Sequence, residues 1–256
     1  MLTKTVLFIH GAWMTPACFD DFCSRFEDAG YTCVAPAWPL MDRPVESLRA
    51  YPSPDFADVG IEAIVDHYEA IIQEMDEPPL IVGHSFGGLF VQMLLDRGVG
   101  AGGVAIDSAP PKGISPTLTA ARANWPAFSA RNGDERILTI EYSDFAWGFA
   151  QTLPEAELQV VFDEHVVPSP GRLFREVGRG PAAVDFDDAS RAPLLLISGE
   201  EDRTVTTRMN YKNYKKYRKS PATTDYQSFE GRSHWIIAEP GWEEVADYAI
   251  QWADAL

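Results

Sequence analysis

One serine lies in a sequence pattern typical of an activated nucleophile. Ser85 is the central residue of a Gly-x-Ser-x-Gly pattern over 83–87. A short apolar run at 80–82 leads directly into this pattern, and an apolar helical pattern over 86–97 follows it. A sharp turn from a strand into a helix can hold a nucleophile in strained geometry, and the two glycines remove side chains that would collide across it. We therefore predict that Ser85 is a nucleophile.

A serine hydroxyl needs an adjacent base before it becomes a good nucleophile. Among the five histidines, His234 is the predicted base, because it lies in a loop between an expected last strand and an expected last helix. Asp202 is the predicted acid, because it lies in a loop that follows an apolar run at 194–197. Its task would be to orient the imidazole and to stabilise its charged form. Asp107, which follows another apolar run, is the alternative acid.

An acyl transfer also needs two preorganised donors for the oxyanion. The backbone N–H of Phe86, directly after the nucleophile, is one candidate. The other should come from the loop after the first strand, where the sequence reads His-Gly-Ala-Trp over 10–13, and Ala12 is the predicted donor. His10 is expected to anchor this loop through hydrogen bonds rather than to take part in the chemistry.

The elements that must position these residues indicate a parallel sheet covered by helices on both faces. Six strands are expected, at 5–9, 32–35, 80–82, 103–106, 194–197 and 226–229, and the strong ones are continuous apolar runs. Helical patterns fill several gaps between them, at 16–29, 61–75, 86–97 and 242–255. The predicted fold class is therefore α/β, a three-layer α/β/α domain with a mostly parallel sheet of about six strands.

The strand pattern stops between the fourth and fifth expected strands. Residues 111–190 read as short helices broken by proline and glycine, and they contain several large aromatic residues. A segment of this length is too long for a loop, so we predict a helical cap inserted into a single domain over 1–256. The aromatic residues favour a mainly apolar substrate pocket, with Trp13 and Trp235 as further candidates for its lining.

Four motifs in this chain order resemble the α/β-hydrolase superfamily. They are the serine turn GHSFGG, the oxyanion loop HGAW, the acid loop GEEDRTV and the histidine loop GRSHW. The His-Gly pair occurs almost at the N-terminus, which resembles the compact branch that holds plant methylesterases and hydroxynitrile lyases. The resemblance implies the same fold, a Ser85–His234–Asp202 triad and an oxyanion donor at Ala12. The lyases have Lys directly after the catalytic His, whereas this chain has Trp235.

The composition restricts the partners. The chain has 256 residues and a formal net charge of −17, which disfavours nucleic acid and anionic membranes. No apolar run approaches the ~20 residues of a membrane helix. The three cysteines form no CxxC pair and no secretory segment precedes them, so a cytoplasmic protein is expected. Histidine and cysteine show no metal-ligand spacing, and we predict neither a metal nor a cofactor.

A basic segment at 209–219 combines three tyrosines with five cationic residues. An amphipathic surface helix is the favoured interpretation, and an anion or partner site is the alternative.

The leading hypothesis is a cofactor-free serine hydrolase that cleaves small carboxylic esters through an acyl-enzyme. Two alternatives stay open at this point. The same triad could serve a lyase, a perhydrolase or a C–C bond hydrolase, and the fold could also belong to a non-catalytic ligand-binding protein. The sequence leaves the identity of the ester and the oligomeric state open.

Overall fold

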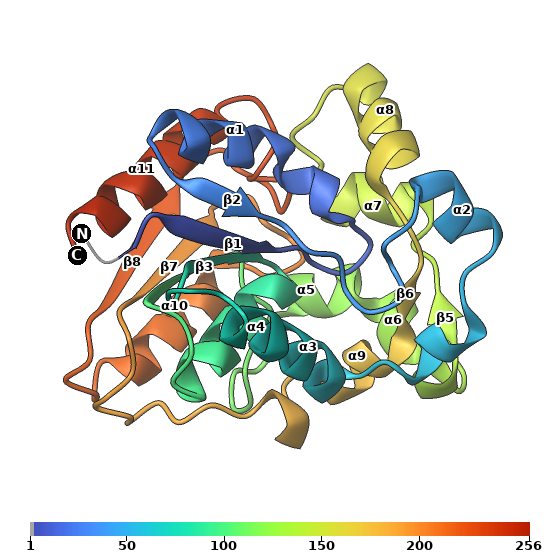
Figure 1. Ribbon diagram of the computed structural model, residues 1–256. Coiled ribbons are helices and arrows are strands. Elements are labelled where there is room, and N and C mark those ends of the chain that lie inside the picture. The colour runs from blue at the N-terminus through green and yellow to red at the C-terminus, as the bar shows by residue number, and fades with distance from the viewer. Residues whose placement is uncertain (1–2) are drawn as a thin grey trace.

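A six-stranded parallel sheet forms the centre of the molecule (Figure 1). The computed structural model describes residues 3–256. The strands follow the order β2-β1-β3-β4-β7-β8, and every neighbouring pair is parallel. Their bounds are Thr5–Ile9 (β1), Thr32–Val34 (β2), Leu80–His84 (β3), Gly102–Ile106 (β4), Leu194–Gly199 (β7) and Thr224–Phe229 (β8). The structure confirms the predicted α/β fold class and all six expected strands.

Helices cover both faces of this sheet (Figure 1). Helices α1 (Asp20–Asp28) and α11 (Trp242–Asp254) pack together on one face, and α3 (Ile61–Gln73), α4 (Phe86–Asp96) and α10 (Thr207–Tyr217) lie on the other. Helix α3, predicted at 61–75, buries Ile61, Ile64, Val65, Tyr68 and Ile72 along one side. A short 3-10 helix η1 (Pro16–Phe19) precedes α1, and α2 (Val45–Ala50) and η2 (Pro54–Asp58) lie between β2 and α3.

The chain between β4 and β7 forms short helices and one small sheet. The helices are α5 (Leu118–Ala123), α6 (Trp125–Ser129), η3 (Gly133–Glu135), α7 (Tyr142–Gly148), α8 (Glu155–His165), α9 (Gly171–Glu176) and η4 (Gly180–Ala182). The expectation that this segment lacks strands was wrong, because β5 (Ile137–Leu138) and β6 (Ser169–Pro170) pair in antiparallel fashion. Strands of two residues are too short to show an alternating pattern in the sequence.

The core strands are buried on both faces, which explains why their sequences are continuous apolar runs. All five residues of β3 and of β4 and all six residues of β7 are buried. Helix α4 is also buried over nearly its whole length, because it packs between β3 and β4 and the neighbouring helices. The turn that carries Ser85 therefore joins two of the most deeply buried elements of the molecule.

None of the helices formed by residues 3–256 is long and apolar enough to cross a membrane. Cys18, Cys23 and Cys33 are free thiols. The expected cytoplasmic location stays a prediction.

Candidate active site

Ser85 occupies the turn between β3 and α4 in a strained backbone conformation. Its φ is 57° and its ψ is −118°, a region that residues with a Cβ rarely adopt. Such strain costs on the order of 1–3 kcal/mol and persists only where neighbours hold it. Here the Ser85 N–H donates to the carbonyl of Ile106 at 2.9 Å, and the Ser85 carbonyl accepts from the N–H of Ala109 at 2.8 Å. Strand β4 and the residues after it therefore fix the turn.

Two glycines allow this turn to fit against its surroundings. A Cβ added at Gly83 would lie 2.3 Å from the carbonyl oxygen of Gly87. A Cβ added at Gly87 would lie 1.9 Å from the carbonyl oxygen of Ile9 in β1. Both distances are too short for non-bonded atoms, so both positions exclude any side chain. The steric explanation predicted for the Gly-x-Ser-x-Gly spacing is confirmed.

Ser85, His234 and Asp202 form one chain of hydrogen bonds. The Nε2 of His234 lies 3.0 Å from Ser85 Oγ, and its Nδ1 lies 2.7 Å from Asp202 Oδ2. A carboxylate only accepts, so Nδ1 carries the proton and Nε2 is free to accept the serine hydroxyl proton. All three side chains are buried. The structure thus brings together three residues that the sequence separates by as many as 149 positions.

Backbone donors hold the Asp202 carboxylate in place. Its Oδ1 accepts from the N–H groups of Thr204 at 2.6 Å and Val205 at 2.9 Å. The other oxygen is left for His234. Because one oxygen is fixed by the loop after β7, the second can orient the imidazole without itself being free to rotate.

A buried glutamate positions the loop that carries His234. Glu239 accepts from the N–H of Ser233 at 2.7 Å, from the Ser233 hydroxyl at 2.9 Å, and from the Thr152 hydroxyl. Its side chain is 2% exposed. The sequence analysis missed this residue. The only signal was an acidic residue after an apolar run, five positions beyond His234.

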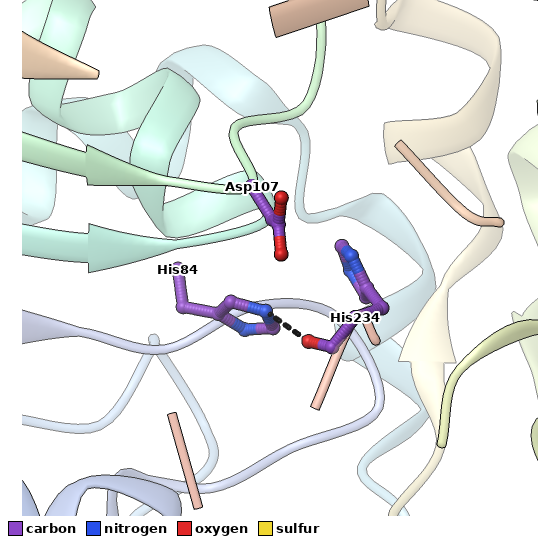
Figure 2. Close-up of side chains that lie close together, drawn as sticks. All are labelled: His84, Asp107 and His234. Atoms are coloured by element: carbon purple, nitrogen blue, oxygen red, sulfur yellow. Dashed lines mark hydrogen bonds between the residues drawn. The ribbon is translucent and has the colours of Figure 1, made fainter. Parts of the chain in front are cut away.

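The His84 ring lies beside the backbone carbonyl of His234 (Figure 2). Its Nε2–H donates to the backbone carbonyl of His234 at 2.7 Å, and the two rings lie 4.7 Å apart. Burial, and then the proximity of His234, lower the pKa of His84 well below its usual 6.5, so this ring is neutral. The sequence analysis assigned no role to His84, whose ring contacts the backbone of His234.

Asp107 lies beside this pair (Figure 2). Ligand atoms of His84, Asp107 and His234 all lie within 4.8 Å of one another, a spacing that could suit a metal ion. However, both ring nitrogens of His234 already bind Ser85 and Asp202. The cluster is therefore better suited to hydrogen bonding than to metal coordination.

Asp107 is the alternative acid, but the structure assigns it a different environment. Its backbone has a φ of 41°, its Oδ1 accepts from the Gly199 N–H at 2.9 Å, and its Oδ2 has no partner within residues 3–256. Burial, and then the charge of Asp202, raise the pKa of Asp107 well above its usual 3.8. This shift in pKa favours the protonated, neutral form of Asp107, and the hydrogen bond to His234 Nδ1 comes from Asp202.

Replacing Asp107 with asparagine should change how stability depends on pH. The folded protein retains a proton on Asp107 above pH 3.8, whereas the unfolded chain loses it. The stabilisation that this bound proton gives the folded state is fully present below pH 3.8. It is lost as the pH rises toward the pKa of Asp107 in the folded protein, by up to about 1.4 kcal/mol per pH unit. Asparagine is neutral at every pH. The free energy of unfolding of Asp107→Asn should therefore increase relative to that of the wild type as the pH rises from 4.5 to 7.5.

Urea unfolding of both proteins at several pH values checks this prediction, with Asp55→Asn, at an exposed position, as the control. Parallel pH curves for Asp107→Asn and wild type would contradict it.

The loop after β1 approaches Ser85 closely. A Cβ on Gly11 would lie 2.7 Å from the Cβ of Ser85, so glycine is required for this approach. The N–H of Trp13 donates to Ser169 Oγ at 2.7 Å and is therefore engaged. Within residues 3–256, the N–H groups of Ala12 and Phe86 have no hydrogen-bond acceptor. Both residues line the same cavity as Ser85, so both amides are candidates for binding an oxyanion.

His10 anchors this loop, as expected. Its Nδ1–H donates to the carbonyl of Gly11 at 3.0 Å, and its Nε2 accepts from the N–H of Trp38 at 3.3 Å. The ring also stacks on Trp38 with centroids 4.6 Å apart. Burial lowers its pKa to about 4, which keeps the ring neutral and fits both hydrogen bonds.

A cavity of about 440 Å³ opens beside Ser85. Its apolar lining includes Trp13, as the sequence analysis expected, together with Phe128, Phe149 and Phe174. The second predicted lining residue, Trp235, is not among the residues that line this cavity. Trp235 is 1% exposed and packs against Phe149, which does line the cavity, with ring centroids 6.1 Å apart.

Comparisons with known proteins agree with this architecture. The sequence pattern of the alpha/beta hydrolase family matches residues 6–248. No curated protein sequence matches the chain. Among solved structures, a methylesterase from Arabidopsis is similar with a TM-score of 0.70 and 12% identity, covering 99% of this chain and 100% of that one. A Paleococcus ferrophilus monoacylglycerol lipase has a TM-score of 0.67 and 20% identity, covering 98% and 94%. A pyrethroid hydrolase from Sphingobium faniae has a TM-score of 0.68 and 18% identity, covering 99% and 98%.

At these identities the solved structures show a shared fold, and the family match spans nearly the whole chain. Together with the parallel sheet and the serine turn between β3 and α4, this match identifies the family. The chain belongs to the alpha/beta hydrolase family.

Proposed function

We propose that the protein hydrolyses small carboxylic esters, with Ser85 as nucleophile, His234 as general base and Asp202 as the acid that orients it. The observation that carries this proposal is the continuous chain of hydrogen bonds from Asp202 Oδ2 through His234 to Ser85 Oγ. The unengaged amides of Ala12 and Phe86 beside the same cavity support it further. The ester-cleaving relatives of the same fold agree with it.

The reaction follows from the geometry. Ser85 Oγ attacks the ester carbonyl while its proton passes to His234 Nε2. The oxyanion that forms is stabilised by the N–H groups of Ala12 and Phe86, and Phe86 begins helix α4, whose N-terminus also favours negative charge. The imidazolium then donates its proton to the leaving alcohol. Water, activated by the neutral His234, cleaves the acyl-enzyme, and the acid is released.

We further propose that residues 111–190 act as a cap that shapes the substrate cavity. Phe128, Phe149 and Phe174 of this segment line the cavity. The segment also orients the oxyanion loop, because Ser169 accepts from the N–H of Trp13 and Phe174 stacks on its ring at 5.1 Å. Changes in this segment should therefore alter substrate choice more than the chemistry at Ser85.

Labelling with a fluorophosphonate probe tests the nucleophile. The wild-type protein should gain the mass of one adduct, because the activated Ser85 attacks phosphorus as it would attack a carbonyl. Ser85→Ala, which removes the attacking oxygen, should gain none. Intact-mass measurement of both proteins, with circular dichroism to show that both are folded, decides the outcome. A folded wild-type protein that takes no label, or an adduct that persists in Ser85→Ala, would refute the proposed mechanism.

A further inference from the structure

Two charged side chains line the cavity beside Ser85, and both are arginines. Arg175 is the penultimate residue of α9, and Arg179 follows shortly after that helix. The other lining residues are apolar or neutral. The whole chain has 38 acidic residues against 21 lysines and arginines, so a lining without any carboxylate differs from the protein's overall charge of −17. The local charge of the cavity favours an anionic ligand.

The charge of these two arginines is not compensated within the protein. Arg175 donates to the backbone carbonyls of Phe128 and Ala130, which orient its guanidinium without neutralising it. Arg179 is exposed, and its side chain has no hydrogen-bond or salt-bridge partner within residues 3–256. Arg172, which lies on α9 with Arg175, instead pairs with Asp58 at 3.3 Å. Arg179 therefore offers a free guanidinium at this cavity.

A third cation lies at the edge of the same cavity. Gly113 is part of the lining, and the Nζ of Lys216 lies 2.7 Å from the position that a Cβ on Gly113 would occupy. Lys216 belongs to α10, the basic segment for which the sequence left an anion site open as the alternative to a surface helix. The positive charge is thus contributed by two separate elements, α10 and the region around α9.

The cavity therefore combines three features: an activated serine with two free amides, aromatic walls, and uncompensated positive charge. The amides are suited to the transient oxyanion, so the arginines are available for a permanent negative charge elsewhere on the substrate. A guanidinium binds a carboxylate through two parallel hydrogen bonds. Because the donors of Arg175 are already partly used by carbonyls, Arg179 is the residue free to make such a pair.

We propose that the substrate is a monoester of a dicarboxylic acid, whose free carboxylate pairs with Arg179 while its ester group lies at Ser85. This proposal rests on the ester hydrolysis proposed above. The acyl–oxygen bond of the ester breaks, Ser85 Oγ holds the acyl group transiently, and the alcohol leaves with a proton from His234. Water then releases the dicarboxylate and a proton.

A matched pair of substrates tests this assignment. Monomethyl adipate and methyl hexanoate have the same chain length and differ by a carboxylate in place of the terminal methyl group. We expect wild-type kcat/KM to be higher for monomethyl adipate. The ratio of the two values should fall about tenfold in Arg179→Ala, because one charge-assisted pair is lost, and further in Arg179→Glu. The control Arg172→Ala, in the neighbouring helix α9 but outside the cavity lining, should keep the wild-type ratio.

A binding measurement separates this proposal from the proposed hydrolysis. Titration calorimetry of Ser85→Ala with monomethyl adipate requires no turnover, and we expect about tenfold weaker binding once Arg179→Ala is added. A wild-type preference for methyl hexanoate, or a ratio and an affinity that are both insensitive to Arg179, would overturn the proposal. Failure of the fluorophosphonate label with Arg179-dependent binding intact would instead refute the hydrolysis and keep the anion site.

Discussion

Replacing His234 with alanine should lower kcat for a small ester by about four to six orders of magnitude, because members of a triad act as a unit. Without the imidazole, no group accepts the Ser85 proton at 3.0 Å, and none returns a proton to the leaving alcohol. Asp202 cannot substitute, since its hydrogen bond is to His234 Nδ1 rather than to the serine. Steady-state hydrolysis of a chromogenic acetate ester measures the loss.

His67→Ala is the matched control for this substitution. His67 lies on α3, is half-buried, and has its Nε2 3.1 Å from the carbonyl of Ala37, away from the cavity lining. His67→Ala should keep kcat within about twofold of the wild type, because His67 lies outside the cavity lining and substitutions away from a functional site usually have small effects. A His234→Ala protein that is folded by circular dichroism and loses less than tenfold would show that His234 is not the base.

Replacing Gly87 with alanine should be among the most destabilising single-methyl additions in this protein. The new Cβ would lie 1.9 Å from the carbonyl oxygen of Ile9 and 2.9 Å from that of His10. Both are backbone atoms at the end of β1, so relief requires a shift of α4 or of the central sheet. Overpacking of a rigid core costs typically 1–3 kcal/mol and occasionally more. We expect a loss of about 3 kcal/mol or more in the free energy of unfolding, measured by urea denaturation.

Activity provides a second measurement for Gly87→Ala, and Gly180→Ala provides the control. A shift between β1 and α4 would move the loop that carries Ala12 relative to Ser85, so kcat should fall in whatever fraction remains folded. A Cβ on Gly180 meets nothing within 4 Å, so Gly180→Ala should stay within about 0.5 kcal/mol of the wild type. Equal stabilities for the two variants would mean that the turn tolerates a side chain.

Some features of the site could be predicted because their causes are local. The serine turn requires glycine two positions before and after Ser85, and this requirement is met within five consecutive residues. The chain order of Ser85, Asp202 and His234 follows from the loops after three strands, each recognisable as an apolar run. His10 could be predicted as an anchor because it directly follows a buried strand. Each of these inferences depends on spacing along the chain.

Other features depend on contacts between distant segments, and the sequence predictions there were incomplete or wrong. Trp235 was expected to line the cavity, yet it is buried against Phe149 and is not among the lining residues. Glu239 had no recognisable role until the fold brought Thr152 and Ser233 to its carboxylate. The strands β5 and β6 are too short to be recognised separately, and they exist only because they pair with each other.

The sequence alone determined the six parallel strands, the turn that carries Ser85 and the chain order of Ser85, Asp202 and His234, because burial on both faces and steric exclusion restrict the types of consecutive residues. Only the tertiary structure decided between Asp107 and Asp202 as the partner of His234, since both follow buried strands and differ in which oxygen reaches Nδ1. It also decided the charge of the cavity. The region of Arg175 and Arg179 and the helix that carries Lys216 are adjacent only in the folded chain, and a charge acts through distance in space rather than along the sequence.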